Sequence, residues 1–121
     1  NYEAANPLTA EYSALLAAWC SDDVEGFQDA MRAAAEFHIS RSRPMTSKVT
    51  YEFDHNFDAI FPAELLVVQA LRRRQGLPEF VADHLLVDTP WALIRDLHVV
   101  APHPMALEAE ARFKRDFPDF H

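Results

Sequence analysis

The stretch from residue 60 to residue 76 most strongly limits what this chain can fold into. It reads IFPAELLVVQALRRRQG and holds the densest apolar run in the sequence. Pro62 suits a first helical position, where a missing N–H costs nothing. The arginine run at 72–74 suits a last turn, where cations complement the helix dipole. Gly76 can then close the helix in the left-handed conformation, so the stretch predicts one complete helix.

The apolar spacing within this helix predicts its position in the fold. Apolar residues leave only a narrow polar stripe, so we expect neighbouring elements to cover the helix on most sides. Leu66 and Leu71 are then core residues, and an aspartate at either position should unfold the domain by burying an unpaired charge. The helix is too short and too charged at its end to span a bilayer, which needs about 20 apolar residues. We therefore predict a central core helix.

Composition extends this prediction to the whole chain. The 121 residues are 50% hydrophobic and include only two glycines, and Ala, Leu, Glu and Arg outweigh the β-branched residues. That balance favours helices over sheets. We predict an all-α fold: a single compact helical domain over residues 1–121, with about five helices and an irregular acidic and aromatic loop. The chain begins with Asn1 rather than Met, which leaves open that it is the C-terminal part of a longer chain.

Charge and cysteine content narrow the classes of partner and site. The formal net charge of −8 argues against nonspecific binding to nucleic acid or to an anionic membrane, because phosphates would be repelled. Such a charge suits solubility, or a partner with a basic surface. The single cysteine, Cys20, excludes an internal disulfide and offers no thiolate zinc site, so we expect a small core residue there. We expect a cytoplasmic protein with no cofactor and no metal.

Capping signals place the other helices. Thr9 can cap a first helix that ends near Cys20, and Asp22 with Glu25 has capping-box spacing for a second helix that ends near residue 40. Thr89 with Pro90 signals the start of a short helix through residue 97. A final amphipathic helix is predicted over 104–117, with an apolar face made of Met105, Leu107, Ala109 and Phe113.

The most unusual cluster lies in the nonhelical segment before the central helix, where we prefer an ordered loop or a helical turn to a strand. This segment mixes carboxylates with aromatic side chains, which are the residues that hold a partner with a positive site. Alternation would place the aromatic residues and His55 against the core, and the acids toward the partner. We expect partner binding here, at Tyr51, Glu52, Asp54, His55 and Asp58. The alternative is a solvated connection whose acids keep the protein soluble.

The same cluster also permits a catalytic interpretation. Asp54, His55 and Asp58 offer oxygen and imidazole ligands, and a carboxylate beside a histidine can tune a general base. The signal is weak, because the sequence lacks a second spaced histidine pair, a glycine-rich phosphate loop and a serine-hydrolase motif. We therefore predict no enzymatic activity, and keep a small helical enzyme or ligand-binding domain built on these three residues as the alternative.

Two further features have structural interpretations. His38 shares a helix face with Phe27 and Met31, so we expect a buried histidine that is hydrogen-bonded to a carbonyl. The arginines at 72–74 could bind a phosphate, but they also lie where a helix end favours cations. We expect a solvated helix end there.

Several residues together carry a family resemblance. An acidic turn leads to a Gly26-Phe27 pair and a helix that ends near His38, and an Ala/Leu-rich helix over 63–77 closes on Arg, Gln and Gly. In this order the chain is similar to the C-terminal helical part of immunity proteins from bacterial polymorphic toxin systems, most nearly the immunity protein 49 family. The similarity covers residues 14 to 95, and the proline-rich segment after residue 98 departs from it.

The resemblance implies a non-enzymatic, all-α protein that binds and neutralises a co-encoded toxin domain, often one delivered by a type VI secretion or contact-dependent system. It implies core roles for Phe27 and His38 and names no residue that contacts the toxin. An inhibitor of this kind is our first expectation, and the small enzyme or ligand-binding domain is the second. A helical subdomain of a larger protein is a third.

Overall fold

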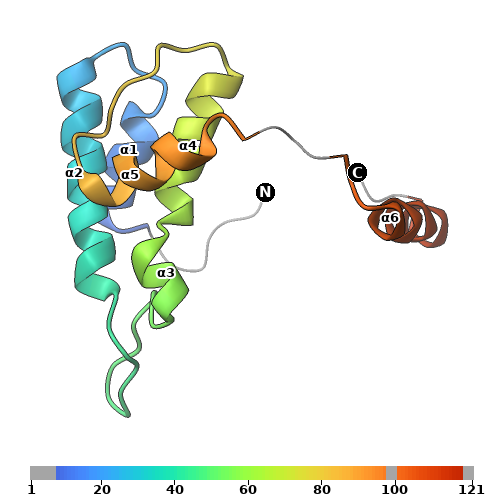
Figure 1. Ribbon diagram of the computed structural model, residues 1–121. Coiled ribbons are helices and arrows are strands. Elements are labelled where there is room, and N and C mark those ends of the chain that lie inside the picture. Colours follow the sequence, from blue (N-terminus) through green and yellow to red (C-terminus); the bar gives the residue numbers. More distant parts are fainter. Residues whose placement is uncertain (1–7, 98–100, 119–121) are drawn as a thin grey trace.

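The computed structural model describes residues 8–97 and 101–118 (Figure 1). The described residues form six α-helices and no strand, which confirms the predicted all-α fold. In chain order the helices are α1 (Ala10–Ala18), α2 (Val24–Arg41), α3 (Asn56–Ile60), α4 (Ala63–Arg74), α5 (Leu85–Ile94) and α6 (Pro104–Asp116).

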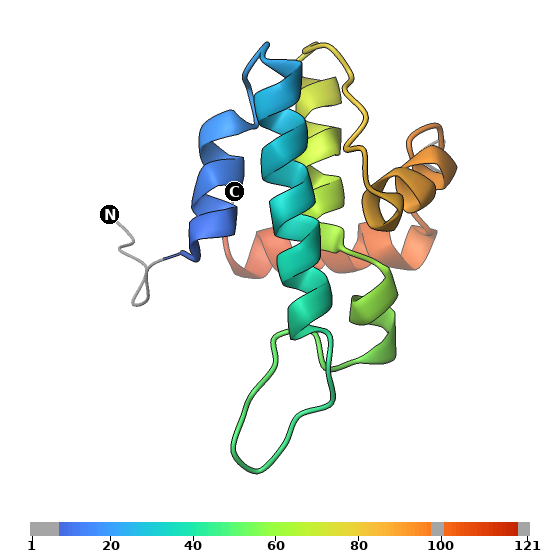
Figure 2. The same ribbon diagram turned by 90° about the vertical axis from the view of Figure 1, so that its left-hand side faces the viewer.

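Three helices make the body of the molecule. Helices α1, α2 and α4 stand side by side, and α5 crosses beside α4 (Figures 1 and 2). The segment between α2 and α3 projects from one end of this body as a long loop, and the short α3 leads back to α4. Helix α6 stands apart from the other five (Figure 1).

The core lies between the facing sides of α1, α2 and α4. Phe27 is fully buried in it, as expected from its place on the apolar face of α2. The spacing of three or four residues along α2 puts its core residues on one face of the helix. The buried hydrophobic side chains are Leu15, Phe27, Ala30, Met31, Ala34, Ala35, Leu65, Leu66, Val68, Ala82 and Val87.

The helix ends follow the local signals with small shifts. Thr9 caps α1, because its Oγ1 accepts a hydrogen bond from the Tyr12 N–H at 3.5 Å. Gly76 has a φ of +69° just after α4, which confirms the predicted left-handed end. Pro62 is the cap residue of α4 rather than its first helical residue. The capping box expected from Asp22 is wrong, because Asp23 is the cap residue of α2.

The predicted start of α5 is also wrong. The helix begins at Leu85, so Pro90 lies inside it and one helical hydrogen bond has no N–H donor. Hydrogen bonds from side chains stabilise the observed start of the helix. The His84 ring accepts a bond from the Leu86 N–H at 3.2 Å, and the Asp88 carboxylate accepts bonds from the N–H groups of Ala82 (2.8 Å) and His84 (3.0 Å). These contacts fix the start of α5 on the N-terminal side of Thr89 and Pro90.

Helix α4 is less enclosed than its apolar spacing predicts. Leu65, Leu66 and Val68 are buried, but Val67 is 52% exposed and Leu71 is 38% exposed. The expectation that α4 is covered on most sides is therefore wrong, and Leu71 is not a core residue. The reason is geometric: the body packs against one side of α4, and no described helix lies against the opposite side (Figure 1).

Helix α6 forms where the sequence predicts it, with Pro104 at its first position. Every residue of α6 is exposed. Leu107 follows Met105 by two positions, so the two side chains project from different sides of the helix and the predicted grouping of Leu107 with Met105 is wrong. Within the described residues, no helix combines the length and apolar character that crossing a membrane requires.

Candidate partner-binding surface

A buried histidine anchors the end of the predicted binding segment to the body. His38 on α2 is fully buried, and its Nε2 lies 2.7 Å from the main-chain oxygen of Asp58 on α3. Because a carbonyl oxygen can only accept, Nε2 carries a hydrogen and donates it. This confirms the expectation of a buried histidine bonded to a carbonyl. The bond fixes the backbone of α3 against α2.

The other ring nitrogen of His38 joins α2 to α4. Its Nδ1 lies 2.6 Å from Oε1 of Glu64, and the Tyr12 hydroxyl donates to the same oxygen at 3.2 Å. Oε1 of Glu64 therefore links α4 to both α2 and α1. Burial, together with the neighbouring Glu64 charge, raises the pKa of the Tyr12 phenol well above its usual value, so this hydroxyl stays a donor.

Two aromatic residues of the segment turn toward the body, as the alternation predicts. The Phe53 ring stacks on the His38 ring with 3.9 Å between centroids, and the Tyr51 ring lies 4.8 Å from the Arg41 guanidinium. Both side chains are half-buried. Phe53 covers the His38 ring from the loop side, and Tyr51 packs on Arg41 at the end of α2.

The acid between these two aromatic residues is held in place by α2. Arg41 Nε donates to the Glu52 carboxylate, and Arg41 Nη2 donates to the main-chain oxygen of Thr50 at 2.8 Å. The bond from Arg41 holds the pKa of Glu52 below its usual value. Arg41 therefore offsets part of the Glu52 charge, and Glu52 contributes less to an acidic surface than the sequence alone suggests.

The alternation ends at His55, where α3 begins. His55 is the cap residue of α3 and is exposed, and its Nε2 lies 3.8 Å from Oδ1 of the half-buried Asp54. Phe57 is 64% exposed rather than docked, because helical spacing replaces strand spacing from Asn56 onward. The expected inward position of His55 and Phe57 is therefore wrong.

Phe57 has an exposed apolar neighbour that the sequence interpretation missed. Ile60 is 71% exposed and lies three residues after Phe57, so both side chains rise from the same side of α3. The spacing of three residues between Phe57 and Ile60 is the sequence signal that could have predicted this pair. We define the α3 surface as the side chains of Asp54, His55, Phe57, Asp58 and Ile60.

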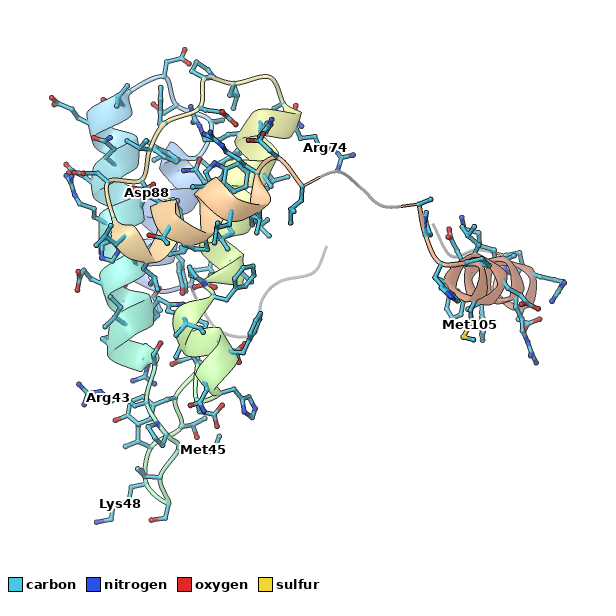
Figure 3. All side chains as sticks on the ribbon, viewed as in Figure 1. Arg43, Met45, Lys48, Arg74, Asp88 and Met105 are labelled. Atoms are coloured by element: carbon cyan, nitrogen blue, oxygen red, sulfur yellow. The ribbon has the colours of Figure 1, made fainter. Side chains whose placement is uncertain are left out.

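The projecting loop carries two exposed cations, a second feature that no site expectation included. Lys48 lies at the tip of the loop, and Arg43 lies nearer to the end of α2 (Figure 3). Thr46 orders the turn, because its Oγ1 accepts hydrogen bonds from the N–H groups of Lys48 (3.4 Å) and Val49 (3.0 Å). The loop therefore carries cations between α2 and its tip, and acids where it returns to α3.

The arginine run at the end of α4 is not a uniformly solvated helix end, so that expectation is wrong. Arg72 is fully buried and donates to the main-chain oxygens of Trp19 (2.6 Å), Ser21 (3.0 Å) and Pro78 (2.9 Å). Burial lowers the pKa of the Arg72 guanidinium. This residue ties the α1–α2 connection to the α4–α5 connection, so it is structural.

Cys20 is exposed, so its predicted place in the core is wrong. Helix α1 ends at Ala18, and Cys20 lies in the turn that leads to α2. Among the described residues, no three His, Cys, Asp or Glu side chains lie close enough together to hold a metal ion. Asp54, His55 and Asp58 form no such group.

Comparison of this chain with protein-family models, with curated proteins and with solved structures found no significant match.

Proposed function

We propose that this chain is an immunity protein that binds and neutralises a cognate bacterial toxin domain, without catalysis of its own. The observation that carries the proposal is the α3 surface, where Phe57 and Ile60 are exposed beside the carboxylates of Asp54 and Asp58. An exposed aromatic and aliphatic pair at the end of a molecule is costly in water, and it supplies anchors for a protein partner.

The charge of the chain favours a basic partner. The net charge of −8 and the acids of the α3 surface would attract a positive cleft over a distance and speed association. The apolar pair would then supply the affinity, since apolar anchors buried at the centre of an interface carry most of its energy.

The fixed position of α3 supports the same proposal. The His38 bond to Asp58 and the stacked Phe53 hold the α3 backbone before any partner arrives. A surface that is already ordered loses little conformational entropy on binding, so more of the contact energy remains as affinity. Nanomolar binding requires about 12 kcal/mol.

The experiment measures binding to the toxin domain encoded beside this chain. Asp54→Lys with Asp58→Lys should slow association and weaken the affinity at least 100-fold, about 2.7 kcal/mol, while circular dichroism shows an intact fold. Asp22→Lys with Asp23→Lys is the matched control, because it makes the same change of charge at two exposed residues at the start of α2. Equal losses in both pairs, or a loss in the control alone, would move the interface away from α3.

A separate assay addresses the alternative of a small enzyme or ligand-binding domain. We expect no turnover from the purified chain. Metal-dependent hydrolysis that disappears in His55→Ala would overturn the proposal and assign the activity to the Asp54, His55 and Asp58 cluster.

A further inference from the structure

The connection between α2 and α3 is longer than the fold requires. It runs from Ser42 to His55, whereas connections between packed helices usually hold about 2–8 residues. The main-chain N–H of Phe53 donates to the main-chain oxygen of Arg41 at 3.4 Å, so the chain returns to the end of α2 before α3 begins. A short turn could therefore join the two helices. Ordered connections of this length are usually functional.

The part of this connection that projects farthest adds nothing to the core. We define the outer loop as residues 43–50, all of which are exposed. It extends beyond the end of α2, at the same end of the molecule as α3 (Figure 2). Met45 is 55% exposed and Val49 is 41% exposed, so the loop presents apolar side chains to water. Packing within the chain therefore does not explain why the loop is this long.

Hydrogen bonds order the outer loop at both its tip and its base. At the tip, the Thr46 N–H donates to the main-chain oxygen of Val49 at 3.0 Å, in addition to the two bonds that Thr46 Oγ1 accepts. At the base, Arg41 donates to the main-chain oxygen of Thr50 and lies over the Tyr51 ring. A loop that is already ordered loses less conformational entropy on binding than a free segment does. It is therefore a preformed projection.

The outer loop is positive in a chain whose net charge is −8. It contains Arg43 and Lys48 and no acid. Within the part of the chain that the structure describes, neither of these two side chains makes a hydrogen bond or an ion pair. The neighbouring Arg41, by contrast, is bonded to Glu52. Both cations of the outer loop are therefore available to carboxylates of another molecule.

The sign of the charge changes between the outer loop and the α3 surface. Lys48 precedes Asp54 by six positions, and six residues of fully extended chain span at most about 20 Å. A nucleic acid or an anionic membrane would attract the loop but repel the acids of the α3 surface and the chain as a whole. A folded protein carries both signs of charge at fixed positions, so it can complement both surfaces. The charge pattern therefore favours a protein partner.

We propose that the outer loop binds an acidic surface of the toxin domain, within about 20 Å of the positive cleft that the α3 surface fits. This inference rests on the proposed function and extends it, because it requires a toxin domain with both signs of charge at its interface. Arg43 and Lys48 pair with carboxylates of the partner. Met45 and Val49 supply apolar contacts beside these pairs, and an unbranched methionine adapts readily to the shape of a partner.

The test is calorimetric binding of the full chain to the toxin domain encoded beside it, at physiological salt. Arg43→Glu and Lys48→Glu should each weaken the affinity at least about 10-fold. Arg74→Glu is the matched control, because it makes the same change of charge at an exposed arginine that has no ion pair among the described residues. Long-range attraction to a basic partner would tighten binding in all three variants, so a loss confined to the loop variants identifies contact with acids. Undiminished binding in both loop variants, or an equal loss in Arg74→Glu, would overturn the inference.

A shortened loop separates this inference from the proposed function. In this variant, Gly-Ser-Gly replaces residues 43–49 and leaves Thr50 in place. The melting temperature should stay near that of the wild type, because the replaced residues bury nothing, and the affinity for the toxin domain should fall at least about 100-fold. Full affinity in the shortened variant would overturn the inference and leave the proposed function standing. A wild-type chain that does not bind the toxin domain would overturn both.

A third measurement addresses a polyanion as the partner of the loop. We expect the wild type to bind neither labelled single-stranded RNA nor phosphatidylglycerol vesicles at physiological salt, because the chain is acidic as a whole. Binding to either one that Lys48→Glu abolishes would assign the outer loop to a polyanion and overturn the inference.

Discussion

Replacing Arg72 should destabilise this protein more than replacing any other charged residue of α4. The guanidinium is fully buried, lies 4.7 Å from the Phe27 ring and 4.4 Å from the Phe80 ring, and donates to three main-chain oxygens. In Arg72→Ala these oxygens lose their donor, at about 1–3 kcal/mol each, and a cavity opens between the two rings. Water entry recovers part of this cost.

We therefore expect Arg72→Ala to lower the free energy of unfolding by about 4–6 kcal/mol, a large part of the 5–15 kcal/mol typical of a domain. The free energy of unfolding of Arg72→Lys should lie between those of Arg72→Ala and the wild type. An ammonium group keeps the charge but cannot stack flat between two rings. Urea unfolding followed by circular dichroism at 25 °C measures both.

Arg74→Ala is the matched control, two residues away on an exposed side of the same turn, and it should change the free energy of unfolding by no more than about 0.5 kcal/mol. If Arg72→Ala and Arg74→Ala agree within 1 kcal/mol, Arg72 does not hold the two connections together and the reasoning fails.

Two further predictions concern the core and its polar link to α3. Leu66→Asp should unfold the domain, and Leu71→Asp should lower the free energy of unfolding by less than about 1 kcal/mol, because only Leu66 is buried. Thermal melting of both variants tests this prediction. Equal losses of stability would contradict the observed orientation of α4. His38→Ala should cost about 3 kcal/mol and accelerate amide hydrogen exchange in residues 56–60 more than in α2, since it removes the bond that fixes Asp58. Uniform exchange changes in both helices would show that His38 does not hold α3 specifically.

Features that depend on near neighbours in the chain could be predicted from the sequence. Thr9 caps α1 through the N–H of a residue three positions away, and Gly76 ends α4 because its own backbone tolerates a positive φ. The burial of His38 followed from its spacing relative to Phe27 and Met31 on one helix face. These interactions span a few residues, so they survive in any fold that contains the helix.

The candidate site was predicted only in part, because α3 replaces strand-like spacing at residue 56. Tyr51 and Phe53 turn inward as alternation requires, while Phe57 turns outward with Ile60. A five-residue helix has too few turns to leave a periodic signal in the sequence, and its position depends on the distant His38.

Which face of each helix is covered was decided only by tertiary structure. Leu66 and Leu71 are equally apolar, yet only Leu66 is buried against the body, and Val67 and Leu71 are exposed on another side of α4. Arg72 and Arg74 share one turn of α4, yet only Arg72 is surrounded by main-chain oxygens. These belong to the α1–α2 connection, more than 50 residues away, and to the α4–α5 connection. The burial of a side chain depends on which distant segments pack against its side of the helix, and the local periodicity of the sequence does not specify those segments.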